Sequence, residues 1–537
     1  MSLFAPTSPT PGRAARLASR VLQVGLIAAV VVVTATRSFD LDRFFVPKEL
    51  VLHATALLAG LLTLARVRHL RVTWTDLALV GVIGVSALSA VWAANPWAAG
   101  RALALTCSGA AVFWVARVLR QEGLGPPLVR SAAIAVVLAA VLALAQAYGI
   151  ESPYFSTNRA PGGTLGNRNF VGHLAAFGLP LLLVPALRSP RWSTVLLSMV
   201  SLVLVVGILV LTRSRAAWLG AGTVLAVLML CVLLAPALRR WSMLMRTGLV
   251  VPVIAVGGIL ATTLPNALDW VSESPYLESA QGMLNYQEGS GQGRLLQYRR
   301  SLELVQQSPL LGVGPGNWSV AYPGVAPPGD PSMSGSRPGM TSNPWPSSDA
   351  VALVSERGLL GVLAWLLFAG SLSWTAWTSL RRKADDRDAD DRDAAGAGLL
   401  LAMSAGVVVT GAFDAVLLLA WPVLLVATVA GALLPAAQAR SIAVPRWLRV
   451  AFFAVLVTLA GVGAVRSGGQ WAAMRLYEAD ASRASLERAA QLDPGSYRVH
   501  LRLAQRTRGT ARCPHAQTAA ALYPHATAAE RLAARCE

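Results

Sequence analysis

The sequence predicts an all-α membrane protein, a polytopic bundle of about thirteen transmembrane helices. Of its 537 residues, 55% are hydrophobic and only 14% are charged, too few charges to cover the surface of a soluble protein of this size. The charges are also unevenly placed, because long stretches such as 193–212 contain none. A run of roughly 20 apolar residues is what the core of a bilayer requires.

The formal net charge of +19 does not indicate nucleic-acid binding. The arginines stand in small groups between apolar runs, where membrane topology places them. We therefore expect membrane lipids around the chain and no nucleic-acid partner. The densest charge run, 381–393, reads RRKADDRDADDRD. We interpret it as a solvated linker on the cytoplasmic side and not as an acidic catalytic cluster.

Apolar runs of sufficient length predict the individual spans. They fall at 21–36, 48–65, 75–93, 101–119, 131–149, 170–187, 193–212, 216–236, 248–264, 358–380, 395–412, 416–435 and 450–466. No small-residue cleavage site follows the first run, so we interpret it as a retained helix and not as a removed signal peptide.

Short basic connections alternate along the chain with connections of other composition. The basic set holds Arg13, Arg16, Arg20, Arg66, Arg68, Arg71, Arg117, Arg120, Arg130, Arg188, Arg191, Arg239, Arg240, Arg246, Arg381, Arg382, Lys383, Arg440, Arg446 and Arg449. The positive-inside rule places this set in the cytoplasm, with the N-terminus in and the C-terminus out. The chain is then a multi-pass protein of the bacterial inner (cytoplasmic) membrane. It has a cytoplasmic tail at 1–20, a membrane domain at 21–466 with a large periplasmic loop at 265–357, and a periplasmic tail at 467–537.

The tail differs in character from the membrane domain. Residues 479–505 read ADASRASLERAAQLDPGSYRVHLRLAQ, with apolar and alanine positions at helical spacing on both sides of Asp493-Pro494-Gly495. Helix, turn and helix is the pattern of a tetratricopeptide-like (TPR-like) pair. One repeat cannot bury its own core, so we expect the tail to pack on the membrane domain or on a partner. The sequence leaves open whether Cys513 and Cys536 form a disulfide or remain separate thiols.

Arginines at the predicted periplasmic ends of spans are candidates for an anion site, since an ionisable residue at membrane depth is costly. Arg213 and Arg215 lie in LTRSRAAWLG, between two apolar runs whose connection is too short to carry them far into water. Interfacial snorkelling is the alternative interpretation.

A glycine-rich entry into a helix is the second candidate. The segment RAPGGTLGNRNF contains Arg159, Asn167, Arg168 and Asn169. A glycine-rich backbone before a helix N-terminus can cradle phosphate oxygens, and the arginines add fixed charge. The alternative is an ordinary turn, because loops of glycine and asparagine are common.

The large loop supplies the third group. It contains Arg294, Tyr298 and Arg299, then SPLLGVGPGNW, SNPWPSSD and SERGLLG. Tyr298 and Trp318 are candidates to line a sugar site, although aromatic residues are also common at membrane interfaces.

Taken in order, these segments resemble the O-antigen ligase and Wzy polymerase family of bacterial envelope glycosyltransferases. GTLGNRNFVGHLA is similar to the family's Gly-Thr-x-Gly-Asn-x-Asn element, and LTRSRAAWLG to its Thr-x-Ser-Arg element. GRLLQYRRSLELVQQSPLLGVGPGNW is similar to the arginine-led helix that ends in Pro-Leu-x-Gly-x-Gly, and SSDAVALVSERGLLG to the segment that closes the large periplasmic loop. The resemblance runs from about Asn158 to Trp365 and places the family arginines on Arg215 and Arg294.

The resemblance implies a GT-C-like membrane fold and a transferase that needs neither metal nor cofactor. The donor would be an oligosaccharide on undecaprenyl diphosphate, and a hydroxyl of a glycan or lipid A-core acceptor would attack the anomeric carbon with inversion. Arg215 and Arg294 would stabilise the departing diphosphate, because guanidinium groups meet phosphate oxygens bidentately. The residues expected to bind substrate are Arg159, Asn167, Arg168, Asn169, Arg213, Tyr298, Arg299, Ser347 and Glu356.

One departure from the family pattern concerns activation of the acceptor. The family's closing segment usually begins with His-Asn, but Ser347 and Ser348 occupy these positions here. Asp349 is then the candidate base, and the alternative is that Ser347 only positions the acceptor. We interpret His173 as a packed helix residue and not as a substitute base. Glu356 either orients an arginine or caps the next helix.

The expected function is therefore glycan transfer in the synthesis of lipopolysaccharide or exopolysaccharide. The motifs do not separate a ligase from a Wzy-type polymerase, and the TPR-like tail points to other polysaccharide assembly proteins as partners. Alternatives from other classes are a transporter or flippase of lipid-linked glycans, and a non-catalytic scaffold. A transporter would tend to show internal repeats and charges midway through its spans, and neither is convincing in this sequence.

Overall fold

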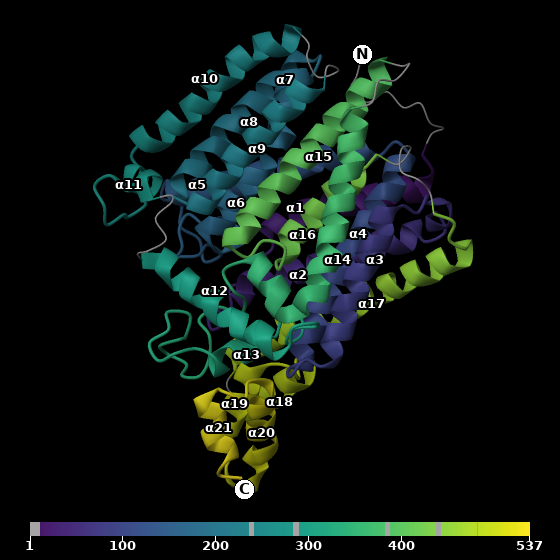
Figure 1. Ribbon diagram of the computed structural model, residues 1–537. Coiled ribbons are helices and arrows are strands. Elements are labelled where there is room, and N and C mark those ends of the chain that lie inside the picture. The colour runs from purple at the N-terminus through teal and green to yellow at the C-terminus, as the bar shows by residue number, and fades with distance from the viewer. Residues whose placement is uncertain are drawn as a thin grey trace.

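The computed structural model describes residues 11–235, 241–282, 289–381, 387–435, 442–480 and 482–536. Its elements over these residues are helices, which confirms the all-α class (Figure 1). Within the described part, 12 helices are long and apolar enough to cross a membrane, and Ala420–Leu433 is a further, shorter apolar helix. The chain is thus a multi-pass membrane protein. Residues 382–386 of the charge run 381–393 and residues 1–10 of the expected cytoplasmic tail lie outside the described residues.

The spans follow one another along the chain with short connections, except for the large loop between Thr263 and Asp349. They are built from α1 (Arg13–Val31), α2 (Asp42–Thr63), α3 (Trp74–Val91), α4 (Pro96–Gln121), α5 (Gly125–Ala147), α6 (Arg168–Gly178), α7 (Pro180–Arg188), α8 (Trp192–Leu211), α9 (Arg215–Leu234), α10 (Trp241–Thr263), α14 (Asp349–Leu380), α15 (Arg387–Phe413), α16 (Ala420–Leu433) and α17 (Arg446–Ala479). α6 and α7 are two pieces of one span. They separate at Pro180, because proline has no N–H for the helix ladder.

The large loop and the tail contain shorter helices. In the loop these are α11 (Pro275–Gln281), α12 (Gly289–Gln307) and α13 (Trp318–Ala321), and in the tail α18 (Arg483–Leu492), α19 (Tyr497–Arg506), α20 (Cys513–Leu522) and α21 (Thr527–Ala533). Single 3₁₀ turns lie at Val67–His69, Gly163–Leu165, Tyr322–Gly324 and Gly509–Arg512.

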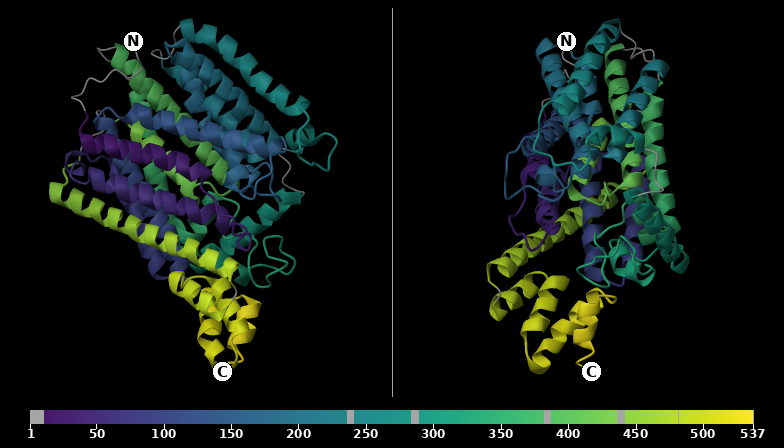
Figure 2. Two further views of the ribbon diagram at one scale, coloured as in Figure 1. Left: turned by 180° about the vertical axis from the view of Figure 1, so that it is seen from behind. Right: turned by 90° about the vertical axis from the view of Figure 1, so that its left-hand side faces the viewer.

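Some helices extend beyond the predicted spans, because hydropathy marks the apolar part of a helix and not its ends. α1 begins at Arg13 because arginine is a good helix former, so its basic first turns precede the apolar run. α17 continues unbroken past the expected boundary at 466 and reaches Ala479 (Figure 2). α14 bends at Gly358, whose φ of 62° is not helical, and its apolar part starts there as predicted.

Connections that the topology prediction assigns to the periplasm meet at one end of the bundle. Side-chain hydrogen bonds join them pairwise: Arg43 to the carbonyl of Phe155 at 2.9 Å, the Asn95 N–H to Asn317 at 2.7 Å, and Asn169 to Asp414 at 3.0 Å. Figure 1 shows α12, α13 and the tail helices gathered at this end.

The basic connections meet at the opposite end. Arg66 pairs with Glu122 at 2.9 Å, and Arg120 pairs with Asp393 at 3.0 Å. Val72, in the connection that carries Arg66, forms an isolated bridge with Ile442 in the connection before α17. The two sets are thus separated by the bundle, as the alternation requires, and the assignment of the basic end to the cytoplasm stays a prediction.

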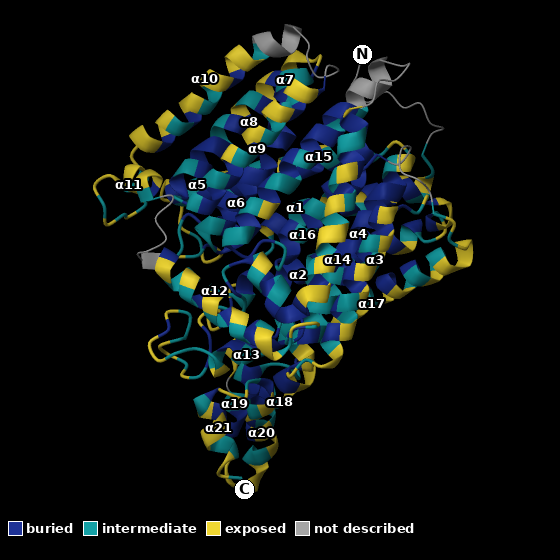
Figure 3. Ribbon diagram, viewed as in Figure 1, coloured by how far each residue is buried: buried dark blue, intermediate teal, exposed yellow. Residues whose placement is uncertain are grey.

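The outer helices expose large apolar side chains to their surroundings. Leu197, Val251, Leu366 and Val465 are all more than half exposed, and Figure 3 shows such positions along the outward faces of α10 and α14. Soluble proteins rarely leave so much contiguous apolar surface in water. These faces therefore suit the hydrocarbon of a bilayer.

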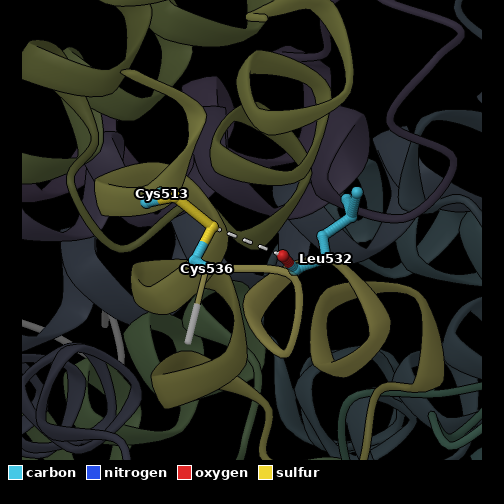
Figure 4. Close-up of a disulfide and its surroundings, with 3 residues drawn as sticks. All are labelled: Cys513, Leu532 and Cys536. Atoms are coloured by element: carbon cyan, nitrogen blue, oxygen red, sulfur yellow. Dashed lines mark hydrogen bonds between the residues drawn. A yellow bond between two sulfur atoms is a disulfide. The ribbon is translucent and has the colours of Figure 1, made fainter. Parts of the chain in front are cut away.

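The tail forms a small helical unit with its own apolar core. Leu486, Ala489, Val499 and Leu503 are buried between α17, α18 and α19. A disulfide joins Cys513 to Cys536 and ties α20 to the segment after α21 (Figure 4). The predicted helix, turn and helix at 479–505 is present, whereas membership of the TPR family stays a prediction.

The tail packs on the membrane part, one of the two expected arrangements. Both oxygens of Glu478 accept N–H groups from Arg37 and Ser38, at 2.9 and 3.2 Å. Asn95 donates through Nδ2 to the carbonyl of Leu522 at 2.9 Å. These bonds hold the tail against two connections that lie far from it in sequence.

Candidate active site

Three helices begin around the predicted arginines: α6 at Arg168, α9 at Arg215 and α14 at Asp349. The free N–H groups and the dipole of a helix N-terminus favour an anion nearby. α6 and α9 pack closely at Gly172, where an added Cβ would stand 3.0 Å from the Cβ of Ala217 in α9. Only glycine permits this approach without a shift.

An indole ring links two of the arginines. The guanidinium carbons of Arg168 and Arg213 lie 4.9 and 4.8 Å from the centroid of Trp270, in cation–π contact. Arg213 also donates through Nε to Ser279 Oγ at 2.9 Å and faces Glu278 at 3.9 Å. Its φ of 52° is uncommon for a non-glycine residue, and such strain tends to cluster at functional sites.

Arg215 reaches the segment that leads into α12. Its Nη1 donates to the carbonyl of Gly282 at 2.5 Å, and the side chain is partly buried. Arg215 therefore connects the start of α9 to the segment that precedes α12, the helix that carries Arg294.

Arg294 projects toward an aspartate that sequence reasoning missed. Asp414 directly follows α15, and its Oδ2 lies 3.8 Å from Arg294 Nη2 and 3.0 Å from Asn169 Nδ2. His173 Nε2 is 3.9 Å from the same oxygen. Both ring nitrogens of His173 are buried, and neither has a hydrogen-bond partner among the described residues. The signal that could have found Asp414 is an ionisable residue in a short link between two apolar runs.

The glycine-rich entry to α6 is held by its own side chains. Asn167 caps the helix by accepting the N–H of Asn169 at 3.0 Å, and the Arg168 N–H donates to the carbonyl of Arg159 at 3.0 Å. Gly166 has a φ of 82° and lies against the ring of Phe44. Asn167 therefore shapes the loop, while Asn169 extends to Asp414.

Asp349 lies at the start of α14 with both carboxylate oxygens engaged. Oδ1 accepts the N–H of Val416 at 2.9 Å, and Oδ2 accepts the N–H of Leu417 at 2.8 Å. These bonds hold the link between α15 and α16, the link that carries Asp414. The role of Asp349 as a base stays a prediction, and its geometry is that of a positioning residue.

Ser347 is held by α12. Its N–H donates to Gln297 Oε1 at 2.7 Å, and its carbonyl accepts the Tyr298 hydroxyl at 2.6 Å. Gln297 is buried and was missed by sequence reasoning, although it lies one helical turn from Arg294 on the same face. Arg299 is exposed on the other face of α12 and is not brought to the cluster.

Glu356 organises the GVGPGNW segment. It is buried, and its carboxylate accepts the N–H groups of Gly316 at 2.8 Å and Trp318 at 3.3 Å. Of the two predicted roles, contact with an arginine is observed: Arg357 Nη1 lies 3.3 Å away. Trp318 is completely buried and donates to Ser301 at 2.9 Å, so its prediction as a sugar-stacking residue is wrong.

A cavity of about 520 Å³ lies between the membrane part and the tail. Arg159 and Glu356 line it, but Arg215, Arg294 and Asp349 do not. A much smaller cavity, about 20 Å³, is lined by His173 and shares Phe45, Leu419 and Ala420 with the large one.

Those shared residues connect the large cavity to the side chains around Asp414. Phe45 makes edge contacts with Phe170 and Trp345, at 5.9 and 5.0 Å between ring centroids. Phe45 thus lines both cavities, and it contacts a ring from the lining of each, Phe170 in the small one and Trp345 in the large one.

No curated protein matches the chain. Residues 200–366 match the model of the O-antigen ligase family. The matched stretch contains Arg213, Arg215, Arg294 and Asp349, and it leaves α6 and Asp414 outside. The chain is thus similar to the O-antigen ligase family over residues 200–366, which supports a role in glycan transfer during the synthesis of envelope polysaccharides.

Proposed function

We propose that the chain is a metal-independent glycosyltransferase at the periplasmic face of the bacterial inner membrane. It transfers a glycan from undecaprenyl diphosphate to a hydroxyl of a glycan or lipid A-core acceptor. The observation that carries the proposal is the convergence of arginines at helix N-termini on one end of the bundle, with Arg168 and Arg213 sharing one indole ring. Such an arrangement matches the charge of a lipid diphosphate.

The leaving group sets the main chemical demand. The acceptor oxygen forms a bond to the anomeric carbon, while the bond from that carbon to the diphosphate oxygen breaks and its electron pair stays on the diphosphate. Arg215 and Arg294 donate hydrogen bonds to the departing oxygens, and Arg168 and Arg213 hold the second phosphate. Guanidinium groups keep their charge in a low-dielectric site, so the developing charge is stabilised throughout.

For the acceptor proton we assign Asp414 in preference to Asp349. Both oxygens of Asp349 accept backbone N–H groups. Asp414 Oδ1 accepts the N–H of Ala415, whereas its Oδ2 faces the side chains of Asn169, Arg294 and His173. Asp414 takes the hydroxyl proton as the new bond forms. Asn169 positions this carboxylate through its hydrogen bond at 3.0 Å.

The remaining residues of the site shape it. Tyr298 and Gln297 hold Ser347 beside the start of α14, where Ser347 orients the acceptor. The same arrangement serves a ligase, which attaches a finished glycan, and a polymerase, which extends one. We retain the ligase as the first assignment and the polymerase close behind it.

Complementation of a deletion strain tests the proposal. Arg215→Ala and Arg294→Ala are expected to abolish transfer, while Arg488→Ala, an exposed arginine of α18, is expected to complement fully. Accumulated short lipid-linked units would identify a polymerase, and unattached long chains would identify a ligase. Normal glycan with both alanine variants would exclude catalysis by these arginines and favour a scaffold.

Cysteine labelling tests the sidedness. Arg299 is exposed on α12, Cys107 and Cys231 are buried, and Cys513 and Cys536 are bonded to each other. Arg299→Cys is therefore expected to react with a membrane-impermeant maleimide added from the periplasm. Reaction only after the cytoplasmic face is opened would overturn the proposed orientation.

A further inference from the structure

The cavity of about 520 Å³ between the bundle and the tail has a wall from each. On the membrane side, Arg37 and Arg337 belong to connections and Trp97 to the first turn of α4. On the tail side, Tyr497 and Arg498 belong to α19. We call this space the tail cavity. We propose that the tail cavity binds the acceptor glycan, so that the tail takes part in acceptor selection. This inference rests on the proposed function.

The lining has the chemistry of a sugar-binding site. It contains aromatic rings, amide and hydroxyl groups, and both signs of charge, which together provide stacking faces, donors and acceptors. The aromatic rings include Trp97, Trp345 and Tyr497, and the amide and hydroxyl groups include Asn95, Asn343 and Thr341. Its volume lies in the range of ligand pockets, about 300–1,000 Å³.

The balance of charge favours an acidic acceptor. Seven arginines line the tail cavity against five carboxylates. Three of those carboxylates are already paired. Asp42 and Glu49 lie 3.4 and 2.8 Å from Arg101, and Glu356 lies 3.3 Å from Arg357. An acceptor that carries phosphate or carboxylate groups would balance the remaining positive charge.

Two arginines from opposite walls face the same space. Arg337 lies on the loop and Arg498 on α19, where Arg498 donates to the carbonyl of Ser38. Burial first, and the nearby Arg498 second, lower the pKa of Arg337. An anionic group bound between the two guanidinium groups would relieve this repulsion.

The tail wall is held firmly enough to discriminate between ligands. Met340 packs with Tyr497 and Ala526 in one apolar cluster, and the Thr527 N–H donates to the carbonyl of Pro338 at 3.2 Å. Together with the bonds of Glu478 and of Asn95, these contacts fix both walls. A site built on fixed elements selects more sharply than one on mobile loops.

The tail cavity also leads toward the proposed chemistry. Gly166, in its lining, directly precedes Asn167, and Leu418 and Leu419 follow closely after Asp414. An acceptor seated in the cavity therefore has its inner end beside the segments that carry Asn169 and Asp414.

Steady-state kinetics on the purified full chain tests the inference. The donor is the lipid-linked glycan, and the acceptor is the lipid and glycan fraction extracted from a deletion strain. Arg337→Ala is expected to raise the acceptor KM at least tenfold with little change in kcat. Arg337→Glu should raise it further, and Arg337→Lys should restore most of the affinity. Arg294→Ala should lower kcat instead.

Arg498→Ala gives a second measurement on the opposite wall, and Arg488→Ala is the matched control on the same tail. The retained Cys513–Cys536 disulfide and an unchanged apparent unfolding temperature show that the tail is folded in each variant. If the wild-type protein is active and both Arg337→Glu and Arg498→Ala have the wild-type KM for the acceptor, the inference is overturned but the proposed function stands. A wild-type chain that transfers no glycan would overturn the proposed function and the inference with it.

Discussion

The carboxylate of Asp414 lies 3.8 Å from the guanidinium group of Arg294, and the amide of Asn169 donates to the same oxygen at 3.0 Å. This one oxygen thus connects α6, α12 and the end of α15, three segments far apart in sequence. The link that carries Asp414 is in turn held by Asp349. The two aspartates have different surroundings, so their variants should behave differently.

Asp414→Asn is expected to lower the rate of glycan transfer by about 10²–10⁴-fold, the range for loss of a general base. In Asp349→Asn, only one side-chain oxygen remains to accept hydrogen bonds from two backbone N–H groups. The substitution is therefore expected to destabilise the protein by about 1–3 kcal/mol. Turnover and apparent unfolding temperature, measured on both variants, separate the roles. A stable, inactive Asp349→Asn beside an active Asp414→Asn would reverse the assignment.

Removal of Glu356 should unfold the segment around it. Glu356→Ala leaves Arg357 buried without its carboxylate and is expected to cost about 3–5 kcal/mol. The control is Glu303→Ala, which breaks a partly exposed pair with Arg300 and should cost at most about 1 kcal/mol. Thermal unfolding in detergent measures both. Equal losses for the two variants would contradict the structural role of Glu356.

Two glycines of α14 should respond oppositely to alanine. Gly358 has a φ of 62°, and a Cβ there would collide with the backbone of Leu310, so Gly358→Ala is expected to cost more than about 1–3 kcal/mol. At Gly370 a Cβ meets nothing within 4 Å, so Gly370→Ala should be neutral or stabilising by up to about 1 kcal/mol. Apparent unfolding temperatures provide the comparison. Tolerance of Gly358→Ala would show that the bend in α14 is not required.

The tail should lose stability in mild acid. His500 and His515 approach at 3.1 Å between their Nδ1 atoms, and burial, the largest cause for each, lowers the pKa of both below the ordinary value of 6.5. The unfolded tail then binds protons more readily than the folded tail, so stability is present above pH 6.5 and is lost as the pH falls below it. Burial also raises the pKa of Asp493 to about 6, which acts in the opposite direction.

Limited proteolysis of the tail as a function of pH checks this expectation, and His515→Gln removes the pair while Asp493 is kept. The difference between wild type and His515→Gln isolates the contribution of the histidines. Identical pH profiles for the two proteins would show that the pair does not titrate with folding.

The sequence predicted the helices well, because the length of an apolar run and the position of turn residues can be read from short segments. The spans, the break before Tyr497 at Asp493-Pro494-Gly495 and the start of a helix after the glycine-rich segment all follow from short stretches of sequence. Asp414 was missed because its importance depends on how α15 packs against α6 and α12. Asp349 was assigned as a base because nothing in the sequence shows that two distant N–H groups occupy its oxygens.

The contacts between the tail and the early connections also constrain the order in which parts of the chain can fold. Arg37 and Ser38 are made at the beginning of translation, yet their partner Glu478 emerges only after all the other spans. Asn95 likewise cannot form its hydrogen bond until Leu522 has been synthesised. Translation must therefore be nearly complete before these early loops can reach their final conformation. A chain that stopped after its last span would already be inserted in the membrane, but its tail cavity would lack the wall that α19 supplies.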